Sequence, residues 1–328
     1  MILVTGGAGY IGSHMVKSLL DQSYEVIVLD NLSTGHKSAV DQRAVFIKGD
    51  VIEEDKLDEI FERYSIECVM HFAANCYVGE SIIKPLKYYK NNVNSSICLL
   101  NKMLEHKVTK IVFSSSCATY GTPNVEKIDE SCHTNPINPY GRSKLMTEQI
   151  VKDISKAHQF DFIFLRYFNV AGADPSGKIG EHHDPETHLI PNILLHLLGK
   201  KDRIVIHGDN YPTEDGTCIR DFIHISDLVE AHLLSLESLI NNNHRNEIYN
   251  VGSNHGYSIK EVIKMCEEVT GKQVNVVHGD RREGDPPKLV ASNQKIYRHL
   301  GWKPKYPLRD IIKTAWNWHF NNPNGYQG

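Results

Sequence analysis

Tyr140 and Lys144 lie four residues apart in the stretch NPYGRSK, which opens an amphipathic run typical of a helix. Residues at this spacing share one helix face, so the phenol and the ammonium group are expected side by side. A nearby positive charge favours the phenolate and brings the tyrosine pKa down from about 10, as a general base requires. Exposed pairs with no chemical role have the same spacing, so the rest of the chain must decide.

A row of serines, Ser114 to Ser116, follows the β-branched run KIVF, which predicts a buried strand. In open α/β sheets, ligands bind at the carboxyl ends of the strands. A hydroxyl at this edge, beside Tyr140 and Lys144 and a nicotinamide, would form a site that moves a proton and a hydride. The neighbouring Cys117 has no obvious histidine partner in the sequence, and we interpret it as a packing residue.

The stretch TGGAGYIG places Gly6, Gly9 and Gly12 after the first predicted strand and at the start of a predicted helix. Glycines here permit a tight turn and let backbone N–H groups approach a pyrophosphate at the positive end of the helix. Asp30 ends the second predicted strand about 20 residues on, where a carboxylate binds ribose hydroxyls and repels a 2′-phosphate. The pattern predicts a dinucleotide site that favours NAD over NADP. Asp50, after the third strand, is either an adenine contact or an ordinary turn residue.

Short β-branched runs alternate with helical segments through the first half of the chain, and FDFIFLRYFNVAG supplies a further buried strand. This order predicts a Rossmann-type, doubly wound parallel sheet with helices on both faces. Loops, short helices and isolated strands follow. We expect an α/β fold with an NAD-binding Rossmann domain at residues 1–170. A smaller C-terminal α/β substrate lobe is expected at residues 171–328, with the chain crossing between the lobes.

Composition narrows the function class. The chain has 328 residues, 41% of them hydrophobic, and a net charge of −4, so no global attraction to nucleic acid or to anionic membranes is expected. Seven cysteines without a CxxC pair indicate reduced thiols. The apolar N-terminal run breaks early at glycine, and no later run is long enough to span a bilayer. We predict a cytoplasmic protein with no nucleic-acid or membrane partner.

The segment EHHDPETH gathers His182, His183, Asp184 and His188, which suggests a metal site. Zinc sites usually show tighter helical or CxxC spacing and a second ligand cluster, and neither is evident in the sequence. We therefore predict no metal.

Taken together, these motifs resemble the UDP-glucose 4-epimerase (UDP-galactose 4-epimerase) family of extended short-chain dehydrogenases/reductases. The matching stretches run nearly end to end: TGGAGYIGSH, VLDNL, HFAA, VGES, PLKYYKNNV, FSSS, NPYGRSKLMTEQI, LRYFNVAGADPSG, YPTEDGTCIRDFIH and RREGD. The resemblance implies that Tyr140 is the general base, that Lys144 activates it, and that Ser116 relays the proton of a sugar hydroxyl. It also implies NAD as the cofactor, with contacts from Gly6, Gly9, Tyr10, Ile11, Gly12, Asp30, Asn31, Asp50, Val51, Phe72, Ala73, Ala74, Asn91, Ser114, Tyr140, Lys144 and Phe168. Phe72, Ala73 and Ala74 would equally fit a plain strand core.

The implied reaction interconverts UDP-galactose and UDP-glucose by transient oxidation at sugar carbon 4, turnover of the 4-keto sugar and return of the hydride. The alternative substrates are UDP-N-acetylglucosamine and UDP-N-acetylgalactosamine, alone or beside the hexoses, with UDP-pentoses less favoured. A sugar-nucleotide dehydratase would carry an Asp-Glu pair after Ser116, where this chain has Cys117 and Ala118. Two further hypotheses are a dehydrogenase that releases NADH and a protein that senses NAD without catalysis.

For the UDP-sugar, the resemblance implies contacts from Ser116, Tyr140, Asn169, His188, Leu189, His207, Arg220, Arg282, Asp285 and Leu289. Arg220 and Arg282 would face the diphosphate, because guanidinium groups bind phosphates through two hydrogen bonds. The chain departs from the family at His207, where a phenylalanine often stacks on uracil. It departs again at His188 (often asparagine), at Cys76 (often lysine) and at Leu289, where some relatives carry a tyrosine beside the sugar's 2-position. The smaller leucine leaves substrate breadth open.

Two predicted helical segments, SIIKPLKYYKNNVNSSICLLNKMLEHK and GRSKLMTEQIVKDISKA, resemble those that form a four-helix dimer interface in the family. Their apolar faces would serve equally well to cover the sheet. We expect a homodimer.

Overall fold

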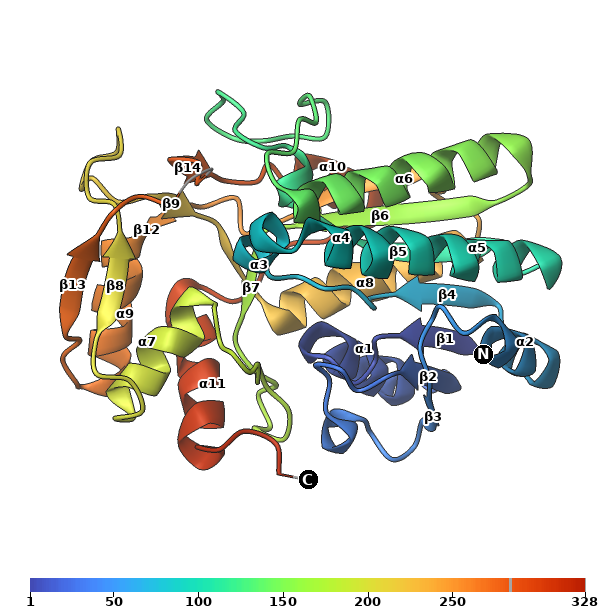
Figure 1. Cartoon of the computed structure of the whole chain (residues 1–328), viewed down its shortest axis with the longest axis horizontal. Helices are drawn as coiled ribbons and strands as arrows, with labels where there is room; N and C mark the ends of the chain where they lie inside the picture. Colours follow the sequence, from blue (N-terminus) through green and yellow to red (C-terminus); the bar gives the residue numbers. More distant parts are fainter. Residues whose placement is uncertain (283–284, 328) are drawn as a thin grey trace.

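A computed structural model describes residues 1–282 and 285–327, so Glu283 and Gly284 of the RREGD motif lie outside the described residues. In this part of the chain, seven parallel strands form the central sheet in the order β11-β6-β5-β4-β1-β2-β3 (Figure 1). The predicted Rossmann-type α/β fold is confirmed. The strands of this sheet are β1 Ile2–Thr5, β2 Val26–Asp30, β3 Val45–Lys48, β4 Cys68–His71, β5 Lys110–Ser116, β6 Asp161–Tyr167 and β11 Glu247–Val251.

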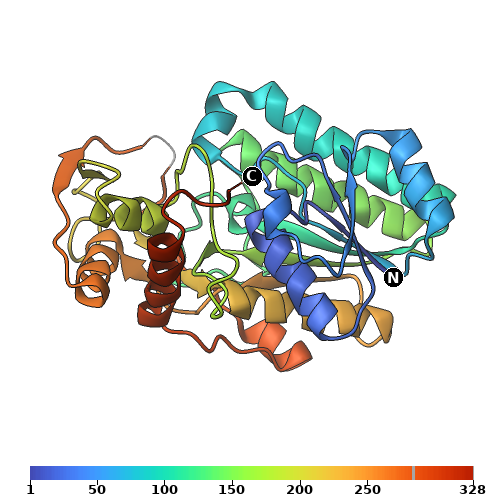
Figure 2. The ribbon, with the colours of Figure 1, turned by 90° about the horizontal axis from the view of Figure 1, so that it is seen from below.

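Helices cover both faces of the sheet, which explains why its inner strands read as continuous apolar runs. Figure 2 shows the two helical layers with the sheet between them. One layer consists of α1 Tyr10–Asp21, α8 Ile225–Ile240 and α10 Gln294–Leu300. The other consists of α2 Glu54–Arg63, α5 Ser95–Glu105 and α6 Pro139–Ala157. Each layer buries its own apolar core against the sheet.

The segment before α5 is broken into short pieces. Pro85 cannot continue a helix and stands at the first position of the next one. The pieces are α3 Val78–Ile83, α4 Pro85–Tyr88 and a π-helical stretch at Tyr89–Asn94. Single turns of 3₁₀ helix cover Lys37–Ala39 and Cys117–Thr119. Across the described residues, no helix combines the length and apolar character needed to cross a membrane.

The predicted strand FDFIFLRYFNVAG is in fact two strands, which corrects the sequence interpretation. β6 ends at Tyr167, and β7 Asn169–Ala171 pairs instead with β10 Phe222–His224 in a separate small sheet. Phe168, between them, is buried in a small cluster with Tyr120 and Ile128. The chain therefore leaves the central sheet at this residue, although its apolar pattern continues.

The following elements build a second core. Helices α7 Leu189–Leu197, α9 Ile259–Thr270 and α11 Leu308–Asn321 pack around the paired strands β8 Ile204–His207 and β13 Val276–Gly279. A second small sheet joins β12 Tyr257–Ser258, β9 Ile219–Arg220 and β14 Lys288–Leu289.

Parts of the C-terminal half return to the central sheet (Figure 1). Strand β11 pairs in parallel with β6 at the sheet edge, although the sequence suggested an isolated strand. Tyr249 on this strand, and Trp302 after α10, are buried in the same core as α1. The division at residue 170 stays a prediction, and the first core contains side chains from both sides of it.

Candidate active site

The glycine loop joins β1 to α1 in a shape that larger residues would not fit. Gly6 has a φ of 72°, and a Cβ placed on it would lie 2.5 Å from the Ala73 nitrogen. A Cβ on Gly12 would lie 2.2 Å from the Gly6 carbonyl oxygen. The turn and the close contact between turn and helix therefore depend on glycine. No acidic side chain stands in the first turn of α1, so its backbone N–H groups suit an anion.

Gly12→Ala is expected to deform this loop and to lower the amount of bound NAD by at least about tenfold, because its Cβ would collide with backbone atoms. Gly9→Ala is the matched comparison, since its Cβ would meet the Gly6 oxygen at an ordinary 3.4 Å. We expect Gly9→Ala to keep the wild-type melting temperature. NAD released from the denatured protein and thermal unfolding would be measured for both variants. Equal NAD content in wild type and Gly12→Ala would contradict this prediction.

A cavity lies where β1, β2 and β4 end, at the edge that binds ligands in open α/β sheets. The predicted cofactor residues that line it are Gly6, Gly9, Asp30, Asn31, Asp50, Val51, Phe72, Ala73, Ala74 and Asn91. Ser33, Thr34, Gly35 and Ser95 also line it and were missed in the sequence. The first three follow Asn31 after one intervening residue, Leu32, so their position in the chain was the available signal. Asn91 lies in the π-helical stretch.

The Asp30 carboxylate lines one side of this cavity. Its two carboxylate oxygens accept hydrogen bonds from the Ala8 nitrogen at 2.9 Å and the Leu32 nitrogen at 2.8 Å. Burial raises the pKa of Asp30 in spite of these donors. The Asn31 side chain donates a hydrogen bond to the Asp50 carboxylate at 2.7 Å, so these two predicted cofactor residues contact each other. Each Asp30 oxygen keeps acceptor capacity for a hydroxyl, and the cavity therefore fits a dinucleotide ribose.

Several predicted cofactor residues direct their side chains elsewhere. The Tyr10 hydroxyl donates to the Gly172 carbonyl at 2.7 Å, and Ile11 packs into the core beneath α1. Phe168 is buried with Tyr120 and Ile128, and the Ser114 hydroxyl contacts the Tyr167 hydroxyl. Tyr10 and Ile11 could serve the cofactor only through their backbone at the start of α1.

The three predicted catalytic side chains converge where β5 meets α6. Ser116 ends β5, and Tyr140 and Lys144 lie in the first turns of α6. This helix begins here because Asn138 accepts a hydrogen bond from the Gly141 nitrogen at 2.8 Å and Pro139 takes the first position. Ser116 and Tyr140 are 8% exposed and Lys144 is 3% exposed.

Lys144 contacts the backbone more closely than it contacts the phenol. Its Nζ donates to the Ser114 carbonyl at 2.8 Å and lies 6.0 Å from the centre of the Tyr140 ring. Burial lowers the pKa of Lys144 to about 8. Burial also raises the pKa of Tyr140 well above its ordinary value; Tyr167, Cys76 and Cys117 add to this, and a hydrogen bond with Ser116 opposes it. The expectation that Lys144 lowers the phenol pKa is therefore not met here, because desolvation dominates at both groups.

The predicted nucleotide contacts form a second group, in the C-terminal half. Arg220 on β9 pairs with Asp285 at 2.5 Å, and Leu289 on β14 stands beside Arg220 in the strand register. His207 ends β8, and burial, together with the exposed Arg282, lowers its pKa. Asn169 donates to the Asp221 carbonyl at 3.2 Å. Arg220 thus lies on a short strand, and its partner Asp285 lies in the segment between β13 and β14.

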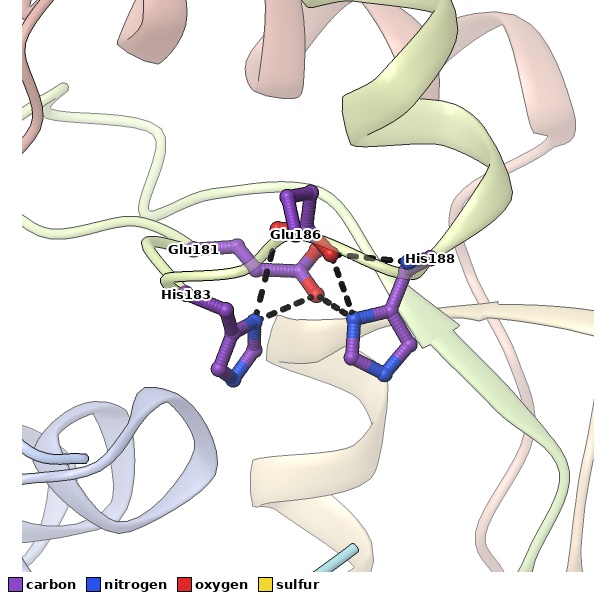
Figure 3. A group of neighbouring side chains, drawn as sticks. All are labelled: Glu181, His183, Glu186 and His188. Carbon is purple, nitrogen blue, oxygen red and sulfur yellow. Dashed lines mark hydrogen bonds and ion pairs between the residues drawn. The ribbon is translucent and has the colours of Figure 1, made fainter. Parts of the chain in front are cut away.

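His188 and Leu189 stand at the start of α7, and here the structure differs from a simple substrate contact. The His188 ring faces Glu181 and Glu186, which also contact His183 (Figure 3). Burial opposes a charge on His183, but its ion pairs with both carboxylates raise its pKa to about 10. His182 lies apart from this group and stacks on His36.

The model of the NAD dependent epimerase/dehydratase family matches residues 2–252 of this chain. The chain belongs to this family. The UDP-glucose 4-epimerase of Halalkalibacterium halodurans is 51% identical over 326 residues, covering 99% of this chain and 97% of that protein. The UDP-glucose 4-epimerase of Lactobacillus helveticus is 47% identical, with 99% of each chain covered.

Solved structures give the same result. A crystal structure of a UDP-glucose 4-epimerase has a TM-score of 0.97 and 49% identity, covering 100% of this chain and 99% of that chain. The UDP-glucose 4-epimerase of Bifidobacterium longum, in complex with NAD⁺ and UDP, has a TM-score of 0.95 and 38% identity, with 99% of each chain covered. The family resemblance read from the sequence is confirmed.

A buried ion pair that was not predicted from the sequence supports α6, the helix that carries Tyr140 and Lys144. Glu148, one turn after Lys144, accepts hydrogen bonds from Arg166 at 2.8 Å and from the Ser115 hydroxyl at 2.6 Å. Its side chain is fully buried and that of Arg166 is 3% exposed. The pair joins α6 to β5 and β6. A charged residue inside the apolar run of β6 was the available signal.

The burial of Lys144 lowers the folding stability of this epimerase by an amount that depends on pH. Because burial lowers the pKa of Lys144 from 10.5 to about 8, the unfolded chain holds one proton more than the folded chain between these pH values. Stability lost at neutral pH is therefore regained as pH rises through this window. Lys144→Met is expected to stabilise the NAD-free protein by about 2–3 kcal/mol at pH 7, with a difference from wild type that shrinks above pH 8. Urea unfolding would measure it.

The control for this experiment is Lys156→Met, since the Lys156 side chain is 77% exposed on the same helix and carries no burial cost. A Lys144→Met protein less stable than wild type at pH 7 would show that the hydrogen bond to the Ser114 carbonyl outweighs desolvation.

Proposed function

We propose that this chain is a UDP-glucose 4-epimerase that interconverts UDP-galactose and UDP-glucose with NAD as its cofactor. The observation that carries the proposal is the convergence of Ser116, Tyr140 and Lys144 beside a glycine-loop cavity, in a chain that matches UDP-glucose 4-epimerases from end to end.

The cavity residues would hold the cofactor in a fixed orientation. The backbone of the glycine loop and the start of α1 suit the pyrophosphate, and Asp30 suits a ribose. Asn31 and Asp50 would lie toward the adenine, and Phe72 to Ala74 along the remaining wall. When bound, NAD supplies the acceptor, and then the donor, for the hydride of sugar carbon 4.

Tyr140 would take the proton from the hydroxyl on sugar carbon 4, and Ser116 would orient that hydroxyl and relay the proton. Burial alone keeps the phenol protonated, so the site needs positive charge to make it a base. Lys144 and the positive ring of the cofactor would supply it together. After the 4-keto sugar has turned over, Tyr140 would return the proton and the stereocentre is inverted.

Such a turnover requires a firm hold on the nucleotide and a loose hold on the sugar. Arg220 and Arg282 would bind the diphosphate, Asp285 the ribose of uridine, and His207 the uracil face. The Arg220–Asp285 ion pair at 2.5 Å would keep both groups in place for the nucleotide. Leu289, beside Arg220 in the register, would border the sugar.

We also propose a homodimer in the cytoplasm. Apolar side chains are exposed along α3 to α6, namely Ile82, Ile83, Leu86, Ile97 and Met146. Leu86 is 80% exposed, which is unfavourable unless another surface covers it. The cysteines are free thiols, which suits a reducing compartment. Light scattering of the purified protein would test the dimer.

The test of function uses purified protein without added NAD, incubated separately with UDP-galactose and UDP-N-acetylgalactosamine. Chromatography of the products is expected to show UDP-glucose from the first substrate. Conversion of the N-acetylated sugar as well would extend the substrate range past Leu289. No product from either substrate, with NAD added and NAD binding shown separately, would overturn the proposed function.

A further inference from the structure

Four side chains with metal-binding atoms meet in the loop before α7. They are Glu181, His183, Glu186 and His188, and their ligand atoms all lie within 4.8 Å of one another. Figure 3 shows both imidazole rings directed at the same pair of carboxylates. The loop belongs to neither the predicted NAD cavity nor the catalytic group, so its arrangement needs a reason of its own.

The two carboxylates of the cluster are protected from water, whereas the His188 side chain is 38% exposed. The Glu181 side chain is 4% exposed and that of Glu186 is 5% exposed. Two buried carboxylates need two compensating positive charges, because an isolated charge is costly away from water. A divalent cation supplies both charges at one point. Without a metal, the protonated rings of His183 and His188 supply these charges, because their ion pairs with both carboxylates raise the pKa of each ring.

The distances around His183 suit a metal better than a hydrogen bond. Its Nδ1 lies 3.4 Å from oxygens of both Glu181 and Glu186, beyond the usual hydrogen-bond range. Neighbouring ligands of a tetrahedral zinc ion stand about 3.4 Å apart, given zinc–ligand bonds of about 2.1 Å. Within the described residues, this buried nitrogen has no partner at hydrogen-bond distance, although both carboxylates lie in ion-pair range. An atom so placed indicates a missing partner between the carboxylates.

The contacts of His188 are shorter. Its Nδ1 lies 3.0 Å from Glu181 and 2.8 Å from Glu186, as in an ion pair. Metal binding would open these contacts by about half an ångström, a small shift for a side chain. Two nitrogens and two carboxylate oxygens form a set of four ligands of types that zinc accepts.

We propose that Glu181, His183, Glu186 and His188 bind one zinc ion, which fixes the loop between the two halves of the molecule. The loop touches both sides. The His183 ring stands edge-on to Tyr10 of α1 and to Tyr77 before α3. The Glu181 carbonyl accepts from Trp318 of α11 at 3.1 Å. This site is independent of the proposed function, because the proposed chemistry uses none of its ligands. His188 is the one ligand for which the family resemblance implied a substrate contact.

The test uses full-length protein without a polyhistidine tag, freed of metal with EDTA. Zinc affinity would be measured by competition with a chromogenic chelator, and zinc content by mass spectrometry. We expect one zinc ion per chain and a higher melting temperature with zinc. His183→Ala/His188→Ala is expected to weaken binding by at least about 100-fold, because outer-shell changes alone cost 10–100-fold. Glu186→Gln, which keeps the side-chain shape, is expected to weaken it at least about tenfold.

The chain offers a matched control. His244, Glu247 and His299 form a more exposed group of possible ligands, but Glu247 is already paired with Lys295 at 2.7 Å. His244→Ala/His299→Ala should leave zinc affinity and stoichiometry unchanged. The proposal is overturned if wild type binds zinc no more tightly than the His183→Ala/His188→Ala protein, or if the control variant loses the zinc instead.

A cobalt(II) spectrum of the wild type tests the site even if the variants fail to fold. We expect the strong visible absorption of tetrahedral cobalt, absent in Glu186→Gln. Weak octahedral absorption in the wild type would mean that the four residues form only a network of histidine–glutamate ion pairs, and would also overturn the proposal.

Discussion

Tyr140→Phe is expected to lower kcat for UDP-galactose conversion by about 100- to 10,000-fold, with the fold and the bound NAD unchanged. The phenol is the group that would carry the proton of the carbon-4 hydroxyl in both directions, and phenylalanine has no proton to exchange. The ring is 8% exposed, so removing one oxygen leaves its packing in place. Because the lost group acts on the reacting atoms, kcat should fall far more than KM changes.

The measurement is a steady-state assay of UDP-glucose formation, with NAD content determined on the same preparation. Tyr297→Phe is the matched control, since this tyrosine is 48% exposed on α10 and far from any predicted role. If Tyr140→Phe kept more than a tenth of the wild-type kcat, another base would have to be sought near Ser116.

Glu148→Ala is expected to destabilise the protein by about 3–5 kcal/mol, because it leaves the Arg166 guanidinium buried without its partner. Arg166 also stacks on the Tyr120 ring at 4.8 Å, a contact that cannot replace a carboxylate. Removing both members of the pair is expected to destabilise the protein less than removing Glu148 alone. Glu148→Met/Arg166→Met is expected to recover most of the lost stability, since neither member of the pair is left as an unpaired buried charge.

Urea unfolding, followed by circular dichroism, would measure these changes. The control is Asp153→Asn, which breaks the Lys156 pair on the same helix, where both side chains are at least 75% exposed. We expect no measurable change from it. A double variant as unstable as Glu148→Ala would show that the pair stabilises the helix by more than mutual charge compensation.

Local patterns predicted most of the candidate site. The glycine loop and Asp30 line the cavity as expected, because each follows the end of a parallel strand and all such ends meet at one edge. The α6 start was readable from Asn138 and Pro139. In each case the decisive residues are neighbours in sequence, so spacing alone carries the information.

What the sequence did not predict depends on tertiary contacts. The pKa of Tyr140 is set by burial under other elements, which its spacing from Lys144 does not reveal. The apolar pattern of β6 runs on past Phe168, and only pairing with β10 separates the two strands. In the histidine-rich loop, Glu181 and Glu186 turn inward beside His183, whereas Asp184 is exposed. An irregular loop has no period from which such directions follow.

The return of β11, α8 and α10 to the central sheet has a consequence for engineering substrate range. A chimera joined at one point near residue 170 would bring the donor's edge strand and two covering helices into the host's first core. Tyr249 would then have to fit beside Leu165 of the host's β6, and the donor's α8 would have to pack on the host's α1. Exchange of the nucleotide-binding elements between relatives therefore needs at least two junctions, with β11 and its helices kept from the host.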